Sequence, residues 1–234
     1  MVDNGKPAAA PATSPGFQTR DPNSPEFWSE RFDQRFMPWD HAGVPEAFQA
    51  FALEHRSTSP NVLIPGCGSA YEALWLAREN WPVKAIDFSS SAVAAAREQL
   101  GEYAGVVEQA DFFAHRPPFD TDWIYERAFL CTLLRDRWHY VVRMAELLRP
   151  GALLAGFYFL GETPRPPFGI ERGTLDALLT SYFELVEEHE VTGSIDVFAE
   201  RERWLTWCGR RSESDARWRR RSECGTILFC RTVF

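Results

Sequence analysis

The chain has 234 residues, of which 45% are hydrophobic and 25% are charged, as in a single sizeable α/β domain. Its 25 Lys and Arg against 33 Asp and Glu give a net charge of −8, which argues against generic nucleic-acid binding. No apolar stretch reaches the length of a membrane span, and residues 1–15 lack the apolar core of a signal peptide. We therefore expect a cytoplasmic protein with no membrane and no nucleic-acid partner.

Cysteine usage points to the same compartment. The five cysteines form an odd set whose spacing matches no metal site. They are Cys67, Cys131, Cys208, Cys224 and Cys230. We interpret them as free thiols and predict no bound metal.

Composition divides the chain into three parts. Residues 1–22 are rich in Pro, Ala, Ser and Thr, so we expect them to be disordered or draped over the surface. Residues 23–210 form the single predicted domain, in which aromatic-rich residues 23–56 make a lid of two helices broken near Pro38. The basic tail 211–234 fits an added strand, a disordered extension and a sequence artefact equally well.

From residue 61 onward, apolar runs alternate with amphipathic segments, which is typical of repeated strand–helix units. Such units predict a parallel sheet with helices on both faces. The predicted strands are 62–65, 83–87, 106–109, 123–126 and 152–160, and the predicted helices are 71–78, 89–100, 135–148 and 173–181. Pro150 and Gly151 are expected to stop the third of these helices. Segments 183–190 and 202–208 are typical of an antiparallel pair that closes a sheet.

The ends of the first two predicted strands carry the most informative residues. The first apolar run stops at Gly66-Cys67-Gly68, and the second stops at Asp87, about twenty residues after the first glycine. Glycines let a ligand approach the backbone, and a carboxylate at a strand end accepts hydrogen bonds from ribose hydroxyls. The arrangement predicts an adenosine-binding crevice. The alternative for Asp87 is an N-cap of the next helix.

The third predicted strand is followed by Asp111-Phe112-Phe113, a carboxylate beside two aromatic rings. These residues suit an adenine, because an acceptor can bind its amine while a ring covers its face. The alternative places both rings in the core and makes Asp111 a helix or turn cap.

The residues after the glycines distinguish between adenosine cofactors. A dinucleotide site normally has a third glycine, which lets a helix N-terminus approach the pyrophosphate. Here the chain continues with Ser69-Ala70-Tyr71-Glu72. The anionic Glu72 would repel a pyrophosphate but suits a ligand with an ammonium and a sulfonium. We therefore expect S-adenosyl-L-methionine as cofactor and S-adenosyl-L-homocysteine as product.

Together these motifs resemble the thiopurine S-methyltransferase family, and within it the thiol and halide methyltransferase branch. The segments that carry the resemblance are Ile64–Gly68, Ala85–Asp87, Asp111–Phe113, Tyr125–Cys131, the lid-like Phe27-Trp28 and Pro38–Asp40, and the substrate-cover-like Arg165–Phe168. The resemblance covers about residues 26–210. It implies a Rossmann-like class I methyltransferase fold, with a mostly parallel seven-stranded sheet, helices on both faces and an antiparallel closing strand.

The resemblance also implies roles for individual residues. The cofactor-binding set would be Trp28, Phe32 and Trp39 around the cofactor, Gly66 and Gly68 beside it, Asp87 on its ribose, Asp111 and Phe112 at its adenine, and Arg127 near its methyl group. Pro167 and Phe168 would cover the substrate. Two departures stand out. Phe32 lies where relatives often carry Trp, and Arg127 matches the thiopurine enzymes, whereas plant halide enzymes carry Tyr there.

Methyl transfer from a sulfonium is an in-line displacement, so the protein mainly aligns the reactants and excludes water. Arg127 is the candidate catalytic residue, because a guanidinium attracts a thiolate and lowers the pKa of a thiol. The alternative for Arg127 is a surface pair with Glu126 or Asp122. The indoles of Trp28 and Trp39 belong either to the lid or to the core.

Three histidines are candidate bases, although solvated surface positions are the favoured interpretation for each. They are His41, His115 and His139. Cys67, beside the glycines, is interpreted as a packing residue rather than a nucleophile.

The function that fits best is a monomeric methyltransferase acting on a small-molecule nucleophile, namely a thiol, a thiopurine, a selenium compound or a halide. One alternative is a methyltransferase acting on RNA, protein or an oxygen or nitrogen acceptor, for which the basic tail is the sole support. Another is a non-catalytic nucleotide-binding module or a dehydrogenase-like fold.

Overall fold

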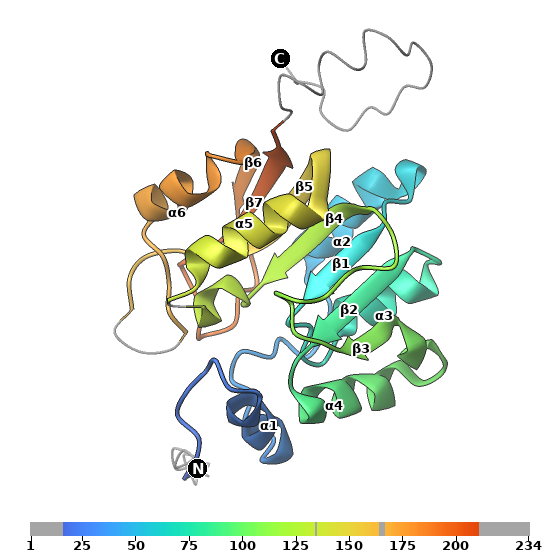
Figure 1. Cartoon of the computed structure of the whole chain (residues 1–234), viewed down its shortest axis with the longest axis vertical. Helices are drawn as coiled ribbons and strands as arrows, with labels where there is room; N and C mark the ends of the chain where they lie inside the picture. The colour runs from blue at the N-terminus through green and yellow to red at the C-terminus, as the bar shows by residue number, and fades with distance from the viewer. Residues whose placement is uncertain (1–15, 134, 164–166, 211–234) are drawn as a thin grey trace, which may run out of the picture.

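The computed structural model describes residues 16–133, 135–163 and 167–210. In this part of the chain, seven strands form one sheet in the order β3-β2-β1-β4-β5-β7-β6 (Figure 1). The strands are β1 (Val62–Pro65), β2 (Val83–Asp87), β3 (Val107–Gln109), β4 (Thr121–Arg127), β5 (Leu148–Phe159), β6 (Phe183–Glu190) and β7 (Glu202–Gly209). The α-helices are α1 (Pro25–Asp33), α2 (Glu46–His55), α3 (Tyr71–Arg78), α4 (Ser90–Leu100), α5 (Arg137–Leu147) and α6 (Arg172–Leu179).

The sheet is mostly parallel. β1 pairs in parallel with β2 and with β4. Two further parallel pairs join β2 to β3 and β4 to β5. Only β7 runs the other way among the described strands, pairing antiparallel with both β5 and β6. The predicted fold class and its antiparallel closing strand are therefore confirmed.

Apolar side chains cover both faces of the sheet. On one face, α2, α3 and α4 contribute residues such as Phe48, Leu76 and Val93 to a single buried cluster. On the other face, α5 and α6 contribute Tyr140 and Leu175 to a second cluster. Each predicted helix thus buries one apolar stripe, which holds the strand ends in fixed positions. Within the described residues, no helix combines the length and apolar character needed to span a bilayer.

Several predicted boundaries differ from the structure by one or two residues, and the largest error is at the start of β5. Helix α5 ends at Leu147, and β5 begins at Leu148 and runs through Pro150 and Gly151 rather than starting at Ala152. The register explains this: Leu148 pairs with Thr121 and Leu153 with Trp123, so a bulge takes up the residues between. Proline is tolerated at a bulge because it lacks only a ladder hydrogen bond that the bulge already interrupts.

The predicted break between the two lid helices is present, because α1 ends at Asp33, α2 begins at Glu46, and residues 34–45, which include Pro38, are not helical. The predicted fourth strand ends in charged residues, yet residues 121–126 of β4 are all buried. Its carboxylates have donors there: Asp122 accepts a hydrogen bond from the Asn61 N–H at 3.0 Å, and the donors to Glu126 are described below.

Candidate active site

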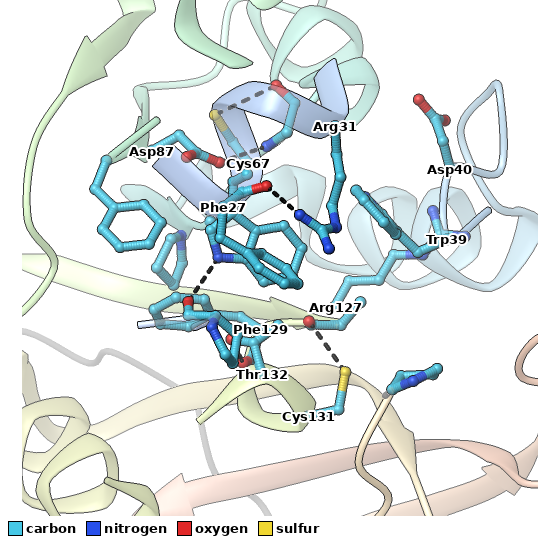
Figure 2. A pocket seen from close by; sticks show the side chains of 18 of the residues that line it. Phe27, Arg31, Trp39, Asp40, Cys67, Asp87, Arg127, Phe129, Cys131 and Thr132 are labelled. Atoms are coloured by element: carbon cyan, nitrogen blue, oxygen red, sulfur yellow. Dashed lines mark hydrogen bonds between the residues drawn. The ribbon is translucent and has the colours of Figure 1, made fainter. Parts of the chain in front are cut away.

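A cavity of about 990 Å³ lies at the carboxyl ends of β1, β2 and β4 (Figure 2). Helix α1 and the segment before it lie beyond these strand ends (Figure 1). The walls of the cavity come from five parts of the chain: residues 16–41, 64–72, 86–88, 110–113 and 125–133, with smaller contributions from residues 136, 167, 168, 197 and 198. This is the place where ligands bind in open parallel sheets. All the predicted site residues line it, namely Trp28, Phe32, Trp39, Gly66, Gly68, Asp87, Asp111, Phe112, Arg127, Pro167 and Phe168.

The loop after β1 depends on its two glycines. Gly66 and Gly68 have φ angles of +60° and +51°, in the left-handed region that favours glycine. A Cβ on Gly66 would lie 2.6 Å from a ring carbon of Phe129, whereas one on Gly68 would lie 3.6 Å from Phe32. The loop therefore passes between two aromatic rings, and Gly66 is the tighter position.

Asp87 ends β2 and is 8% exposed. Its Oδ2 accepts a hydrogen bond from the Gly68 N–H at 3.1 Å, and its Oδ1 accepts one from the Ser89 N–H at 2.9 Å. Burial raises the pKa of Asp87 above its ordinary value. The cap of α4 is instead the Ser89 hydroxyl, which accepts from the Ala92 N–H at 3.1 Å. Each carboxylate oxygen of Asp87 keeps capacity for one more donor.

Asp111 and Phe112 occupy the positions that both interpretations expect, and the structure shows the turn-cap and core roles directly. Asp111 caps a turn, because its Oδ1 accepts from the Phe113 N–H at 2.9 Å, and its side chain also borders the cavity. Phe112 is 4% exposed and packs edge-on to Phe129, with ring centroids 5.3 Å apart. Phe113 is exposed and does not belong to the core.

The two lid indoles meet at the cavity rather than in the core. Trp28 and Trp39 are both half-buried and contact each other edge to face, with ring centroids 5.3 Å apart. The Trp28 Nε1–H donates to the Pro22 carbonyl at 2.8 Å, which holds the ring in place. The indoles and the buried Phe32 thus form an aromatic wall opposite the glycine loop.

Residues 16–22 extend this wall, and Glu30 of α1 holds them. The Glu30 carboxylate accepts hydrogen bonds from the Gln18 N–H at 2.7 Å and the Thr19 N–H at 2.9 Å. Arg31 also lines the cavity, with its guanidinium 3.2 Å from the centre of the Phe27 ring. The sequence reasoning missed Arg31, although its position four residues after Phe27 puts both on one helix face.

Arg127 reaches the cavity from the end of β4 (Figure 2). Its Nη1 lies 2.8 Å from Oε1 of Glu72, and the Tyr125 hydroxyl donates to the same oxygen at 3.1 Å. The predicted alternative, a surface pair with Glu126 or Asp122, is wrong. Arg127 is instead a largely buried cation whose partner comes from the first turn of α3.

Glu126 supports the loop that follows β4. It accepts hydrogen bonds from the N–H groups of Phe129 at 3.0 Å and Leu130 at 2.8 Å, and from the Tyr140 hydroxyl. Burial raises the pKa of Glu126 to about 7, although these donors oppose the shift. This carboxylate therefore fixes the backbone that places Phe129 against Gly66.

The remaining wall lies beyond β4. The Phe168 N–H donates to the Cys131 carbonyl at 3.1 Å, and Phe198 packs in the same small cluster as Cys131. Arg165 and Pro166 of the predicted substrate cover lie outside the described residues, as do Cys224, Cys230 and the tail 211–234. Cys67 and Cys131 are free thiols. Burial raises the pKa of Cys67 and Cys131, so neither is an activated nucleophile.

The three histidines differ in setting. His139 is exposed, as expected, but His115 is 8% exposed and lies away from the cavity, so its predicted surface position was wrong. His41 lines the cavity, and its Nε2 lies 3.2 Å from the Gly193 carbonyl oxygen.

Comparison with known proteins identifies the family. Residues 23–221 match the model of the thiopurine S-methyltransferase family. The chain belongs to this family. It is 26% identical over 191 residues to thiocyanate methyltransferase 1 of Arabidopsis thaliana, covering 77% of this chain and 83% of that one. It is 27% identical over 184 residues to the thiopurine S-methyltransferase of Vibrio atlanticus (strain LGP32), covering 68% and 83% of the two chains.

Solved structures agree on the fold. Magnesium protoporphyrin IX methyltransferase from Synechocystis with bound S-adenosylhomocysteine superposes with a TM-score of 0.63 at 13% identity, covering 80% of this chain and 99% of that one. As a member of the thiopurine S-methyltransferase family with this Rossmann-like fold, the protein is an S-adenosylmethionine-dependent methyltransferase.

Proposed function

We propose that the protein transfers the methyl group of S-adenosylmethionine to the sulfur of a small thiol or thiopurine. The observation that carries this proposal is the single cavity in the described residues that joins Asp87 and the glycine loop at one end to Arg127 at the other. A donor and an acceptor that share one cavity can meet in line. The proposal gives each end a separate task.

The residues at the first end fit the methyl donor. Asp87 would accept hydrogen bonds from the ribose, because its two oxygens each keep spare capacity. Gly66 and Gly68 would pass beside the methionine part, and Asp111 and Phe112 would flank the adenine. The bound donor supplies an activated methyl group on a sulfonium. The indoles of the lid exclude water and offer π faces to that cation.

The second end suits an apolar body with one polar atom. Phe168, Phe198 and Cys131 supply apolar surface, and Arg127 supplies N–H groups beyond the one that contacts Glu72. In the reaction, a bond forms between the methyl carbon and the acceptor sulfur while the methyl–sulfonium bond breaks and leaves its electron pair on the departing sulfur. The thiol proton leaves to solvent. Arg127 would donate hydrogen bonds to the sulfur as it loses that proton.

The names of the similar proteins support a small sulfur acceptor. They include thiopurine S-methyltransferases, thiocyanate methyltransferases and a probable thiol methyltransferase 2 of Arabidopsis thaliana. We also infer that the protein works as a cytoplasmic monomer on small molecules rather than nucleic acid, in keeping with its net charge of −8.

Radiolabelled methyl transfer tests the proposal. The purified full chain is given labelled S-adenosylmethionine with an aromatic thiol, an aliphatic thiol, a thiopurine, iodide or RNA. Labelled thioether from at least one thiol or thiopurine, with equal release of S-adenosylhomocysteine, is the expected result. Labelled RNA with no labelled thioether would overturn the proposal.

A further inference from the structure

The cation at the acceptor end of the cavity is already neutralised by the protein. Glu72 is 7% exposed, and its Oε1 accepts hydrogen bonds from both Arg127, at 2.8 Å, and Tyr125, at 3.1 Å. Glu72 lies in the first turn of α3 and Arg127 at the end of β4, and packing against the sheet holds both elements in place. Separating the two side chains would leave a buried charge without its partner, which costs free energy. An acceptor at this end therefore meets a balanced ion pair and not a free positive charge.

The charge of a second carboxylate also acts on this cation. Glu202, at the start of β7, is 5% exposed, and the Ser194 hydroxyl donates to it at 2.6 Å. Burial alone would lower the pKa of Arg127, but the hydroxyl oxygen of Tyr125 and the charges of Glu72 and Glu202 raise it overall. The charges of two buried acids thus act on one guanidinium.

This charge balance matters for the choice of acceptor. Similar proteins are named for thiocyanate, a small inorganic anion, and for thiopurines and thiols, which can enter uncharged. A charge in a poorly solvated site gains or loses far more energy from a neighbouring charge than it would in water. An uncharged thiol is almost indifferent to the second carboxylate, whereas thiocyanate or iodide is repelled by it.

We propose that Glu72 is a specificity-determining residue, which by pairing with Arg127 makes the cavity select uncharged thiols over small inorganic anions. The inference rests on the proposed function, which supplies the thiol as acceptor, and deepens it by naming the charge of that acceptor on entry. Glu72 does not touch the reacting atoms in this account. It sets the potential that those atoms experience.

The test uses Glu72→Gln, which removes the charge and keeps an oxygen that accepts from Tyr125 and Arg127. Thiocyanate is titrated calorimetrically into wild type and variant, each saturated with S-adenosylhomocysteine, which carries no sulfonium. We expect the variant to bind thiocyanate about tenfold more tightly or better, because loss of one nearby charge is worth at least that factor. The ratio of kcat/KM for thiocyanate to that for a neutral thiol should rise in parallel.

Three further variants sharpen the measurement. Glu202→Gln should also tighten thiocyanate binding, by a smaller factor than Glu72→Gln does. Glu188→Gln removes the carboxylate from an exposed pair with Arg172 and should leave thiocyanate binding unchanged. Arg31→Met in the Glu72→Gln background asks whether the lid guanidinium is the anion site; retained thiocyanate binding supports Arg127, and lost binding overturns the proposal.

Equal thiocyanate affinity in wild type and Glu72→Gln would overturn the inference. If Glu72→Gln does not fold, the wild type alone tests the inference. A wild-type kcat/KM for thiocyanate equal to or above that for the neutral thiol would contradict the proposed selectivity. These outcomes differ from failure of the proposed function, which would show as no thiol or thiopurine methylation by the wild type in any condition.

Discussion

The backbone N–H of Gly68 donates a hydrogen bond to Oδ2 of Asp87 at 3.1 Å, and this contact ties the end of β2 to the loop after β1. One buried carboxylate therefore serves two purposes. It shapes the glycine loop, and it borders the cavity where the proposal places the ribose. Loop geometry and cofactor affinity should depend on it together.

Asp87→Asn tests this double role. Asparagine has a single carbonyl oxygen, so either the Gly68 N–H or the Ser89 N–H would face an amide donor. We expect the dissociation constant for S-adenosylhomocysteine to rise about tenfold or more, with a loss of stability of about 1 to 3 kcal/mol. Asp176→Asn, in an exposed pair with Arg172, is the control and should change neither. Affinity within twofold of wild type would argue against the ribose role.

Most of the fold could be predicted because its strands are buried and sharply bounded. Strands β1, β2 and β6 and helix α3 begin and end at the predicted residues. The apolar runs of β1 and β2 stop at a Pro-Gly pair and at a lone carboxylate, which are strong local signals, whereas β6 is mostly exposed. β5 could not be delimited in this way, since its bulge against β4 depends on pairing between distant residues.

The candidate site likewise has residues that local sequence signals predict and residues that they do not. Gly66, Asp87 and Asp111 follow strands directly, and parallel strand ends meet at one edge, so the sequence could bring them together. The pairing of Arg127 with Glu72 joins residues 55 positions apart. Nothing local specifies that contact, and Phe198, which lies in an irregular segment, gave no signal either.

Gly66→Ala should destabilise the protein more than Gly193→Ala. Both glycines have positive φ angles, +60° and +77°, so both substitutions cost about 1 to 2 kcal/mol of backbone strain. Only at Gly66 does the added Cβ meet another group, the Phe129 ring at 2.6 Å, which adds roughly 1 to 3 kcal/mol. Chemical denaturation measures both free energies of unfolding. Equal losses would show that Phe129 yields without cost.

Glu126→Gln should change how stability depends on pH. Because the folded pKa of Glu126, about 7, is raised above its ordinary 4.5, the carboxyl contributes stability below pH 4.5 that is lost as pH rises through 7. Between pH 5 and 8 the wild type should therefore lose roughly 2 to 3 kcal/mol relative to the variant, which cannot ionise there. Parallel stability curves for the two proteins would contradict this.

Trp39→Ala should weaken binding of S-adenosylhomocysteine by about tenfold, because it removes half of the edge-to-face indole pair at the cavity. Trp138→Ala is the matched control. Trp138 is 48% exposed on α5 and does not line the cavity, so its loss should leave the affinity unchanged. Fluorescence titration with each variant gives the two dissociation constants. Unaltered affinity in Trp39→Ala would mean that the lid does not contact the ligand.

Arg127→Met should lower kcat/KM for thiols by about tenfold or more while the affinity for S-adenosylhomocysteine changes by less than a few-fold. Methionine keeps the packing over Phe157, where the guanidinium lies 5.3 Å from the ring centre, but cannot donate a hydrogen bond to the acceptor. Arg172→Met, on the surface, is the control. Unchanged thiol turnover would remove Arg127 from the mechanism.

The account as a whole depends on a sulfonium nucleoside binding across the ends of β1 and β2. Isothermal titration of the wild type with S-adenosylmethionine, beside a titration with NAD, tests this most directly. We predict one saturable site per chain for S-adenosylmethionine and no heat with NAD. A flat titration with S-adenosylmethionine, or saturable binding of NAD, would contradict the account.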